Sequence, residues 1–176
     1  MDQLFLEKMF TFSNKVGGLV ETSRFREKIR FLEKYPDLGR EFHTEIPMEH
    51  PSHGQPSNCY GTLDWILDDK NENRLPLWMP SWKFSKKYLI EENNLNGRKH
   101  PDCLVLFWSG EGDIQHAALY IGECEKMEAI AHQPDTGEIY SIDTPEFHKE
   151  FYPECYEYDF YKIPVPKTIS QIAQSL

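Results

Sequence analysis

The sequence lacks the features by which membrane and exported proteins are usually recognised. No stretch reaches the roughly eighteen continuous apolar residues that a membrane helix needs. The N-terminal segment MDQLFLEKMFTFSNK carries Asp2, Glu7 and Lys8 among its apolar residues, so it has neither the basic start nor the apolar centre of a signal peptide. We therefore expect no membrane insertion, and a protein that is cytoplasmic or exported without a classical signal peptide.

The chain also has fewer basic than acidic residues. The chain has 19 Lys and Arg residues against 29 Asp and Glu residues, which gives a formal net charge of −10. This sign is wrong for a surface that follows a phosphate backbone or an anionic membrane. The composition therefore argues against nucleic acid as a partner.

Cysteine pairs of the metal-binding kind are absent. The four cysteines, Cys59, Cys103, Cys124 and Cys155, form no C-x-x-C pair and have no histidine at a spacing that zinc sites use. Disulfides are disfavoured in a cytosolic setting. We expect no metal and no organic cofactor, so each cysteine has to be explained singly.

What the chain does have is enough apolar and aromatic material for one globular domain over residues 1–176. Hydrophobic residues make up 39% and aromatic residues 14%. Helical periodicity predicts one helix over 4–16 and a second helix that begins after Ser23, its N-cap, and ends at residue 35. Gly17 and Gly18 are expected to separate the two helices. Two more helices are expected, from Cys59 and from Ser81, the latter again a cap.

From residue 103 the pattern changes to short β-branched or aromatic runs separated by turn residues. The predicted strands are 103–108, 114–122, 126–132, 138–143 and 155–163, with a helix-like segment over 144–152. Short connections favour antiparallel pairing. The sequence therefore predicts an α+β fold with helices first and a twisted sheet of four to five antiparallel strands second.

Cys59 stands at the start of the predicted helix in NCYGTLDWIL. Chemistry by a thiol requires the thiolate, and the unpaired N–H groups at a helix N-terminus favour negative charge. A neighbouring imidazole can then take the thiol proton, as in cysteine hydrolases. This position predicts a nucleophile with a lowered pKa, although a lone cysteine is more often an ordinary buried residue.

His116 is the candidate base, because it interrupts the apolar strand IQHAALYIG. Alternation places Ile114, His116, Ala118 and Tyr120 on one face and Ala117, Leu119 and Ile121 on the other. His132 ends the next predicted strand, so a hairpin would bring the two histidines within reach of each other. A third polar group of this kind fixes the ring of the base.

Cys59 followed by GDIQHAALYIG resembles the papain-like cysteine peptidases of the NlpC type. Those enzymes have a cysteine opening a helix, a strand of the form G-D-x-x-H-x-x-x-Y-x-G, and a polar third residue, often histidine, at the end of the following strand. Gly112, Asp113, His116, Tyr120 and Gly122 match that strand. His132 falls where the third residue is expected. The family's usual D-C-S-G is replaced here by Asn58-Cys59-Tyr60-Gly61.

The resemblance implies a papain-like fold with a helical N-terminal part over 1–50, a catalytic core over 55–163 and a C-terminal tail over 164–176. It implies cleavage of an amide or peptide bond, in a cell-wall-type peptide or another amide, through a thioester acyl-enzyme. Cys59 would be the nucleophile, His116 the base and His132 its orienting partner. Contacts to the oxyanion or substrate would come from Gln55, Asn58 or Tyr60. Loop amides such as those of Gln55 and Asn58 are more often cap or turn residues.

Three alternatives remain at this stage. The same Cys/His pair can transfer the acyl group to an acceptor other than water. A non-catalytic module of the same fold would bind a peptide or protein partner in its groove, and Trp78, Trp82 and Phe84 are candidates for lining such a groove. A metal-binding protein would use side chains of the loop over 43–53 as ligands, although a solvated loop is the simpler interpretation of this segment. The candidate ligands are His43, Glu45, Glu49, His50 and His53.

Overall fold

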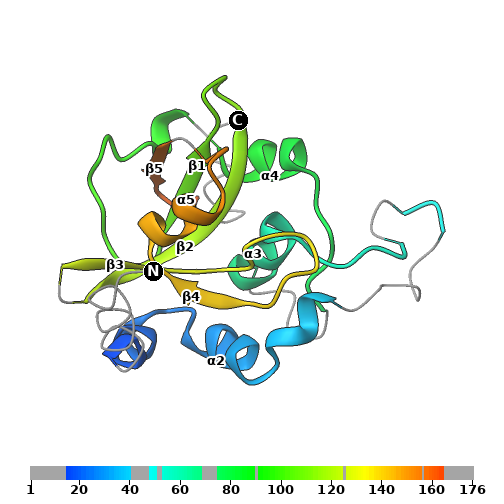
Figure 1. The fold of residues 1–176 in the computed structure, drawn as a ribbon, viewed down its shortest axis with the longest axis horizontal. Coiled ribbons are helices and arrows are strands. Elements are labelled where there is room, and N and C mark those ends of the chain that lie inside the picture. The colour runs from blue at the N-terminus through cyan, green and yellow to red at the C-terminus, as the bar shows by residue number, and fades with distance from the viewer. Residues whose placement is uncertain are drawn as a thin grey trace, which may run out of the picture.

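The computed structural model describes residues 15–40, 48–50, 53–68, 75–89, 91–124, 126–155 and 157–164 of the chain. Within them lies an antiparallel sheet of strand order β4-β3-β2-β1-β5 (Figure 1). Its strands are β1 (Cys103–Trp108), β2 (Ile114–Cys124), β3 (Met127–His132), β4 (Ser141–Asp143) and β5 (Glu157–Tyr161). The predicted α+β class is confirmed, and β1 has its predicted bounds. The predicted tail lies outside the described residues except for residue 164.

Helices precede the sheet, as predicted, but their boundaries differ. The structure has α2 (Arg26–Lys34), α3 (Cys59–Leu67), α4 (Ser81–Tyr88) and α5 (Pro145–Phe151), with 3-10 turns at Pro36–Arg40 and Glu91–Asn93. Residues 15–22 are also helical, so the prediction that Gly17 and Gly18 separate two helices is wrong. Residues 4–14 of the first predicted helix lie outside the described part of the chain.

Neither predicted serine cap acts as one. Ser23 Oγ accepts a hydrogen bond from the backbone N–H of Phe25, which is itself the N-cap of α2, and donates to Asp102 at 2.5 Å. Ser81 is the first residue of α4, and Pro80 is the N-cap. Ser23 forms a tertiary contact with Asp102 instead, and Pro80 takes the N-cap position before Ser81. Both observed N-caps lie within two residues of the predicted cap, which is the usual uncertainty of helix boundaries.

The two faces of the sheet carry separate buried clusters. Ala117, Leu119 and Ile121 of β2 pack with Cys59 and with the apolar side of α3. Ala118 and Tyr120 belong to the second cluster, on the opposite face. The alternation predicted for β2 is therefore confirmed from Ala117 to Ile121. It is wrong for Ile114, which packs against the first cluster because the register between β1 and β2 shifts between Phe107 and Trp108.

The connection from β4 to β5 places a helix against the second face. β4 and β5 are the two edge strands, so the chain must cross the sheet between them, and α5 lies on this crossing (Figure 1). Thr144 caps α5 by accepting a hydrogen bond from the backbone N–H of Phe147, and Pro145 follows at the first position. In the part of the chain that the structure describes, no helix has the length and apolar character needed to cross a membrane.

Candidate active site

Asn58 sets the start of α3. Its Oδ1 accepts hydrogen bonds from the backbone N–H groups of Gly61 and Met79, and its Nδ2 donates to the carbonyl of Met79. The amide therefore caps the helix and fixes the loop before α4 at the same time. These bonds use Oδ1 and one of the two hydrogens on Nδ2, so the role of Asn58 as an oxyanion donor stays a prediction.

Gln133 holds the same helix start to the sheet. Its Oε1 accepts hydrogen bonds from the hydroxyls of Ser57 and Thr62, and its Nε2 donates to the carbonyl of Ser57. All of these bonds are buried. Sequence reasoning missed Gln133, although it directly follows His132. Gln55, the other predicted oxyanion donor, is exposed and lies outside the buried cluster around Cys59.

Gly61 allows the loop before α4 to approach the first turn of α3. A Cβ atom at this position would lie 1.6 Å from the carbonyl oxygen of Leu77. We expect Gly61→Ala to lower the free energy of unfolding by about 3 kcal/mol, because a rigid backbone atom would have to move. Gly18→Ala is the matched control, since a Cβ there meets nothing within 4 Å, and it should stabilise the helix by about 0.5–1 kcal/mol.

Urea denaturation of the two variants beside the wild type measures both changes. Equal stability of Gly61→Ala and the wild type would mean that the loop before α4 does not pack against the start of α3.

Cys59 begins α3, as predicted, and is 6% exposed. Burial raises the pKa of its thiol to about 12, and hydrogen bonds from the backbone of Ala117 and Tyr60 only partly offset this effect. The predicted lowering of the pKa is therefore wrong for this conformation. The helix N-terminus favours the thiolate, but removal from water disfavours it more.

A chain of hydrogen bonds joins three residues of neighbouring strands. His116 Nε2 lies 2.7 Å from His132 Nδ1, and His132 Nε2 lies 3.1 Å from Asp143 Oδ2. The Ser141 hydroxyl donates to the same carboxylate oxygen at 2.6 Å. The predicted contact between His116 and His132 is confirmed, and Asp143 extends it.

The direction of this relay follows from its carboxylate end. Burial alone would raise the pKa of Asp143, but hydrogen bonds from His132 and Ser141 bring the pKa below its usual value. The carboxylate therefore accepts a hydrogen bond from the N–H at His132 Nε2, which leaves His132 Nδ1 to accept a hydrogen bond from the N–H at His116 Nε2. This tautomer gives His116 a lone pair on Nδ1, the atom that a base would use.

The relay lies in a dry environment. His116 and His132 are 2% and 3% exposed. Burial lowers the pKa of His116 well below its usual value, and the neighbouring His132 and His148 lower it further. The imidazole of His116 is therefore neutral at neutral pH.

The thiol of Cys59 and the ring of His116 pack in different clusters. Cys59 packs with Ala117 on the α3 face, whereas the ring of His116 contacts Phe107 of the second cluster, with 5.4 Å between ring centroids. The thiol contacts the backbone of Ala117, the residue after His116. Among the described residues no hydrogen bond joins the thiol to His116. If Cys59 is the nucleophile and His116 its base, the sulfur should lie roughly 3 to 4.5 Å from the nearest ring nitrogen, and this separation stays a prediction.

His148 and Cys155 lie next to the relay. The ring of His148 on α5 stacks on His116 at a centroid distance of 4.1 Å, and its Nε2 lies 3.6 Å from Cys155 Sγ. Burial lowers the pKa of His148 to about 3, with a smaller lowering from His132. Cys155 therefore has a histidine as a direct neighbour.

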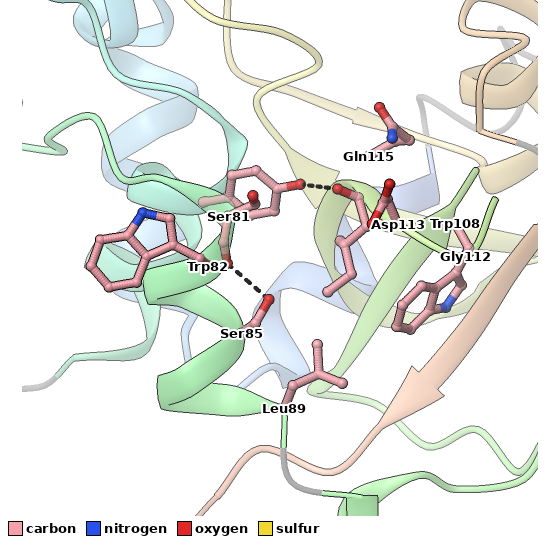
Figure 2. A pocket seen from close by; sticks show the side chains of 10 residues that line it. Ser81, Trp82, Ser85, Leu89, Trp108, Gly112, Asp113 and Gln115 are labelled. Atoms are coloured by element: carbon pink, nitrogen blue, oxygen red, sulfur yellow. Dashed lines mark hydrogen bonds between the residues drawn. The ribbon is translucent and has the colours of Figure 1, made fainter.

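An open pocket of about 750 Å³ lies beside this site (Figure 2). Tyr60 and Trp82 contribute aromatic side chains, and Asp113 and Gln115 contribute polar groups. Trp82 is 69% exposed, while Phe84 is a core residue, so only part of the predicted aromatic groove exists. Cys59 and His116 do not line the pocket, but the residues next to them in the sequence do.

Tyr60 and Trp108, which line the pocket, each carry one polar group. The hydroxyl of Tyr60 donates to the carbonyl of Ile114 at 2.8 Å, which ties the helix start to the beginning of β2 (Figure 2). The indole N–H of Trp108 is buried and has no hydrogen-bond acceptor among the described residues.

No protein-family model, curated protein or solved structure matches the chain. The chemistry of the site therefore has to follow from its own geometry.

Proposed function

We propose that the protein is a papain-like cysteine hydrolase that cleaves an amide or peptide bond through a thioester acyl-enzyme. The observation that carries this proposal is the hydrogen-bonded relay of Asp143, His132 and His116, which leads to the strand backbone that Cys59 contacts. A buried relay of this kind orients one imidazole nitrogen as a base. A purely structural histidine pair has no need of that orientation.

In the proposed reaction, the sulfur of Cys59 attacks the carbonyl carbon while Nδ1 of His116 takes the thiol proton. The C–N bond breaks, and His116 gives this proton to the leaving amine. Water then attacks the thioester, with its proton passing to His116, and the acid and a free thiol result. The backbone N–H of Cys59 at the helix start is the proposed donor to the oxyanion.

The resting pair is neutral in this mechanism. Burial raises the thiol pKa and lowers that of His116, so the proton moves only when the sulfur attacks. The thiol contacts the backbone of Ala117, so the proposed reaction requires a rearrangement that brings the sulfur to Nδ1 of His116.

The pocket beside Tyr60 is the proposed substrate site. Trp82 offers an exposed aromatic surface, and Asp113 offers a carboxylate that suits a cationic or hydrogen-bond-donating group (Figure 2). The resemblance favours a cell-wall-type peptide, and transfer to an acceptor other than water uses the same intermediate. A non-catalytic peptide-binding module would use this pocket without forming an acyl-enzyme.

An activated ester tests the proposal without knowledge of the natural substrate. Cys59 should attack the carbonyl of p-nitrophenyl acetate, release p-nitrophenolate and retain one acetyl group as a thioester. We expect a burst of p-nitrophenolate in a stopped-flow measurement and an acetyl group on the Cys59 peptide in mass spectrometry. Cys59→Ala should abolish both signals.

Cys124→Ala is the matched control, because Cys124 at the end of β2 is a more exposed thiol than Cys59 and its removal should not affect the burst. Acetylation of the other cysteines at the same rate as Cys59, or no acetylated cysteine at all, would refute the hydrolase and favour the binding module.

A further inference from the structure

Three buried imidazoles meet on the face of the sheet that α5 covers. His116 comes from β2, His132 from β3 and His148 from α5, and each offers a nitrogen atom within 4.8 Å of the other two. All three residues are at most 3% exposed. The proposed relay uses only His116 and His132, so it does not account for the third imidazole.

We infer that His116, His132 and His148 together bind one divalent transition-metal ion of the zinc class. Imidazole nitrogen is a preferred ligand of such ions, and three histidines with one position left for water are a common zinc ligand set. The inference does not depend on the proposed hydrolase activity.

The surroundings of the cluster fit this ligand set. His132 presents Nδ1 to the cluster and donates from Nε2 to Asp143, the carboxylate arrangement that orients metal-binding histidines. Asp143 is fixed in turn by Ser141. Cys155 lies against Nε2 of His148 and limits the rotation of that ring.

Binding requires small movements of the rings. His116 Nε2 and His132 Nδ1 are 2.7 Å apart in their hydrogen bond, whereas two tetrahedral ligands at about 2.0–2.1 Å from zinc are about 3.3 Å apart. The proton on His116 Nε2 moves to Nδ1, so this step releases no proton. The rings of His116 and His148 have to tilt out of their stacked arrangement.

A second pocket gives space for this movement. It has a volume of about 160 Å³ and is lined by His148, Asp143 and the aromatic residues Phe147, Phe151 and Tyr152. Phe151 is 55% exposed, so the pocket lies near the surface. An ion can therefore approach the cluster from the α5 side, away from the thiol.

Ion binding also has a consequence that does rest on the proposed function. A proton on His116 Nδ1 removes the base, so the bound ion should inhibit acetylation of Cys59 reversibly. Zinc would then act as a regulator of the hydrolase. Removal of the ion by a chelator should restore the burst.

Isothermal titration calorimetry of the full chain with Zn²⁺ tests the site without measuring activity. We expect one ion per chain and a loss of affinity of more than 100-fold in His148→Ala. Asp143→Asn, which keeps all three ligands, should weaken binding about 10–100-fold. Far-UV circular dichroism checks that each variant is folded, and Asp143→Asn keeps the test decisive if His148→Ala does not fold.

Two controls separate this cluster from other histidines. His100→Ala removes an exposed histidine before β1 and should bind Zn²⁺ like the wild type. His50→Ala with His53→Ala removes loop histidines and should also have no effect. Absence of binding, loss of binding in the loop variant, or unchanged affinity in both folded cluster variants would overturn the inference. None of these results would affect the test of the hydrolase, which measures the thioester.

Discussion

His116→Ala is expected to slow acetylation of Cys59 by p-nitrophenyl acetate about 100-fold or more. The imidazole takes the thiol proton during attack, and general-base catalysis typically contributes about 10²–10⁴-fold. The effect should be large here because the thiol pKa is raised by burial, so little thiolate exists without a base. Stopped-flow release of p-nitrophenolate measures the rate.

The control for this variant has to separate loss of the base from loss of packing. His116 is 2% exposed, so removal of its ring leaves a cavity. His116→Gln retains more of the side-chain volume and should be equally slow. His100→Ala should match the wild type. If His116→Gln were as fast as the wild type, another group would be the base.

His132→Ala is expected to slow the same reaction about 100-fold, although His132 does not touch the thiol. Its Nδ1 accepts the proton of His116 Nε2 and so keeps the lone pair of His116 on Nδ1. Without this partner the imidazole of His116 can adopt the other tautomer or turn. The burst rate of the folded variant measures the loss.

Asp143→Asn distinguishes a relay from simple packing at His132. An amide can donate to His132 Nε2, which would reverse every proton position along the relay and place a proton on His116 Nδ1. We expect acetylation to slow by at least about tenfold with little change in stability. Ser141→Ala leaves the carboxylate in place and should have a small effect. Unchanged rates in both His132→Ala and Asp143→Asn would exclude the relay from the reaction.

The sequence predicted the sheet well because the determinants of its strands are local. Short apolar runs bounded by Gly, Pro and Asp residues gave β1 at its observed bounds and β2 and β3 nearly so. The contact between His116 and His132 followed from the predicted hairpin of consecutive strands. Helix boundaries were less predictable, since Ser23 and Ser81 form other contacts or yield to a proline.

The rest of the site depends on tertiary placement. His148 reaches His116 only because α5 lies on the crossing between the two edge strands, and no local pattern specifies that path. Asp143 was a strand-end residue in the sequence, with nothing to pair it with His132 until β4 met β3. The pKa of Cys59 was mispredicted because burial is a property of the whole fold.

The position of β5 in the sheet affects the order in which the histidine cluster can form during folding. The pairs β1 with β2, β2 with β3, and β3 with β4 are neighbours in sequence and have low loop-closure cost. β5 has to pair with β1, about fifty residues earlier, before α5 is held across the sheet. His116 and His132 can therefore meet early, whereas His148 joins them only when the last described strand has docked. On a ribosome, a nascent chain would have an incomplete cluster until β5 has left the exit tunnel.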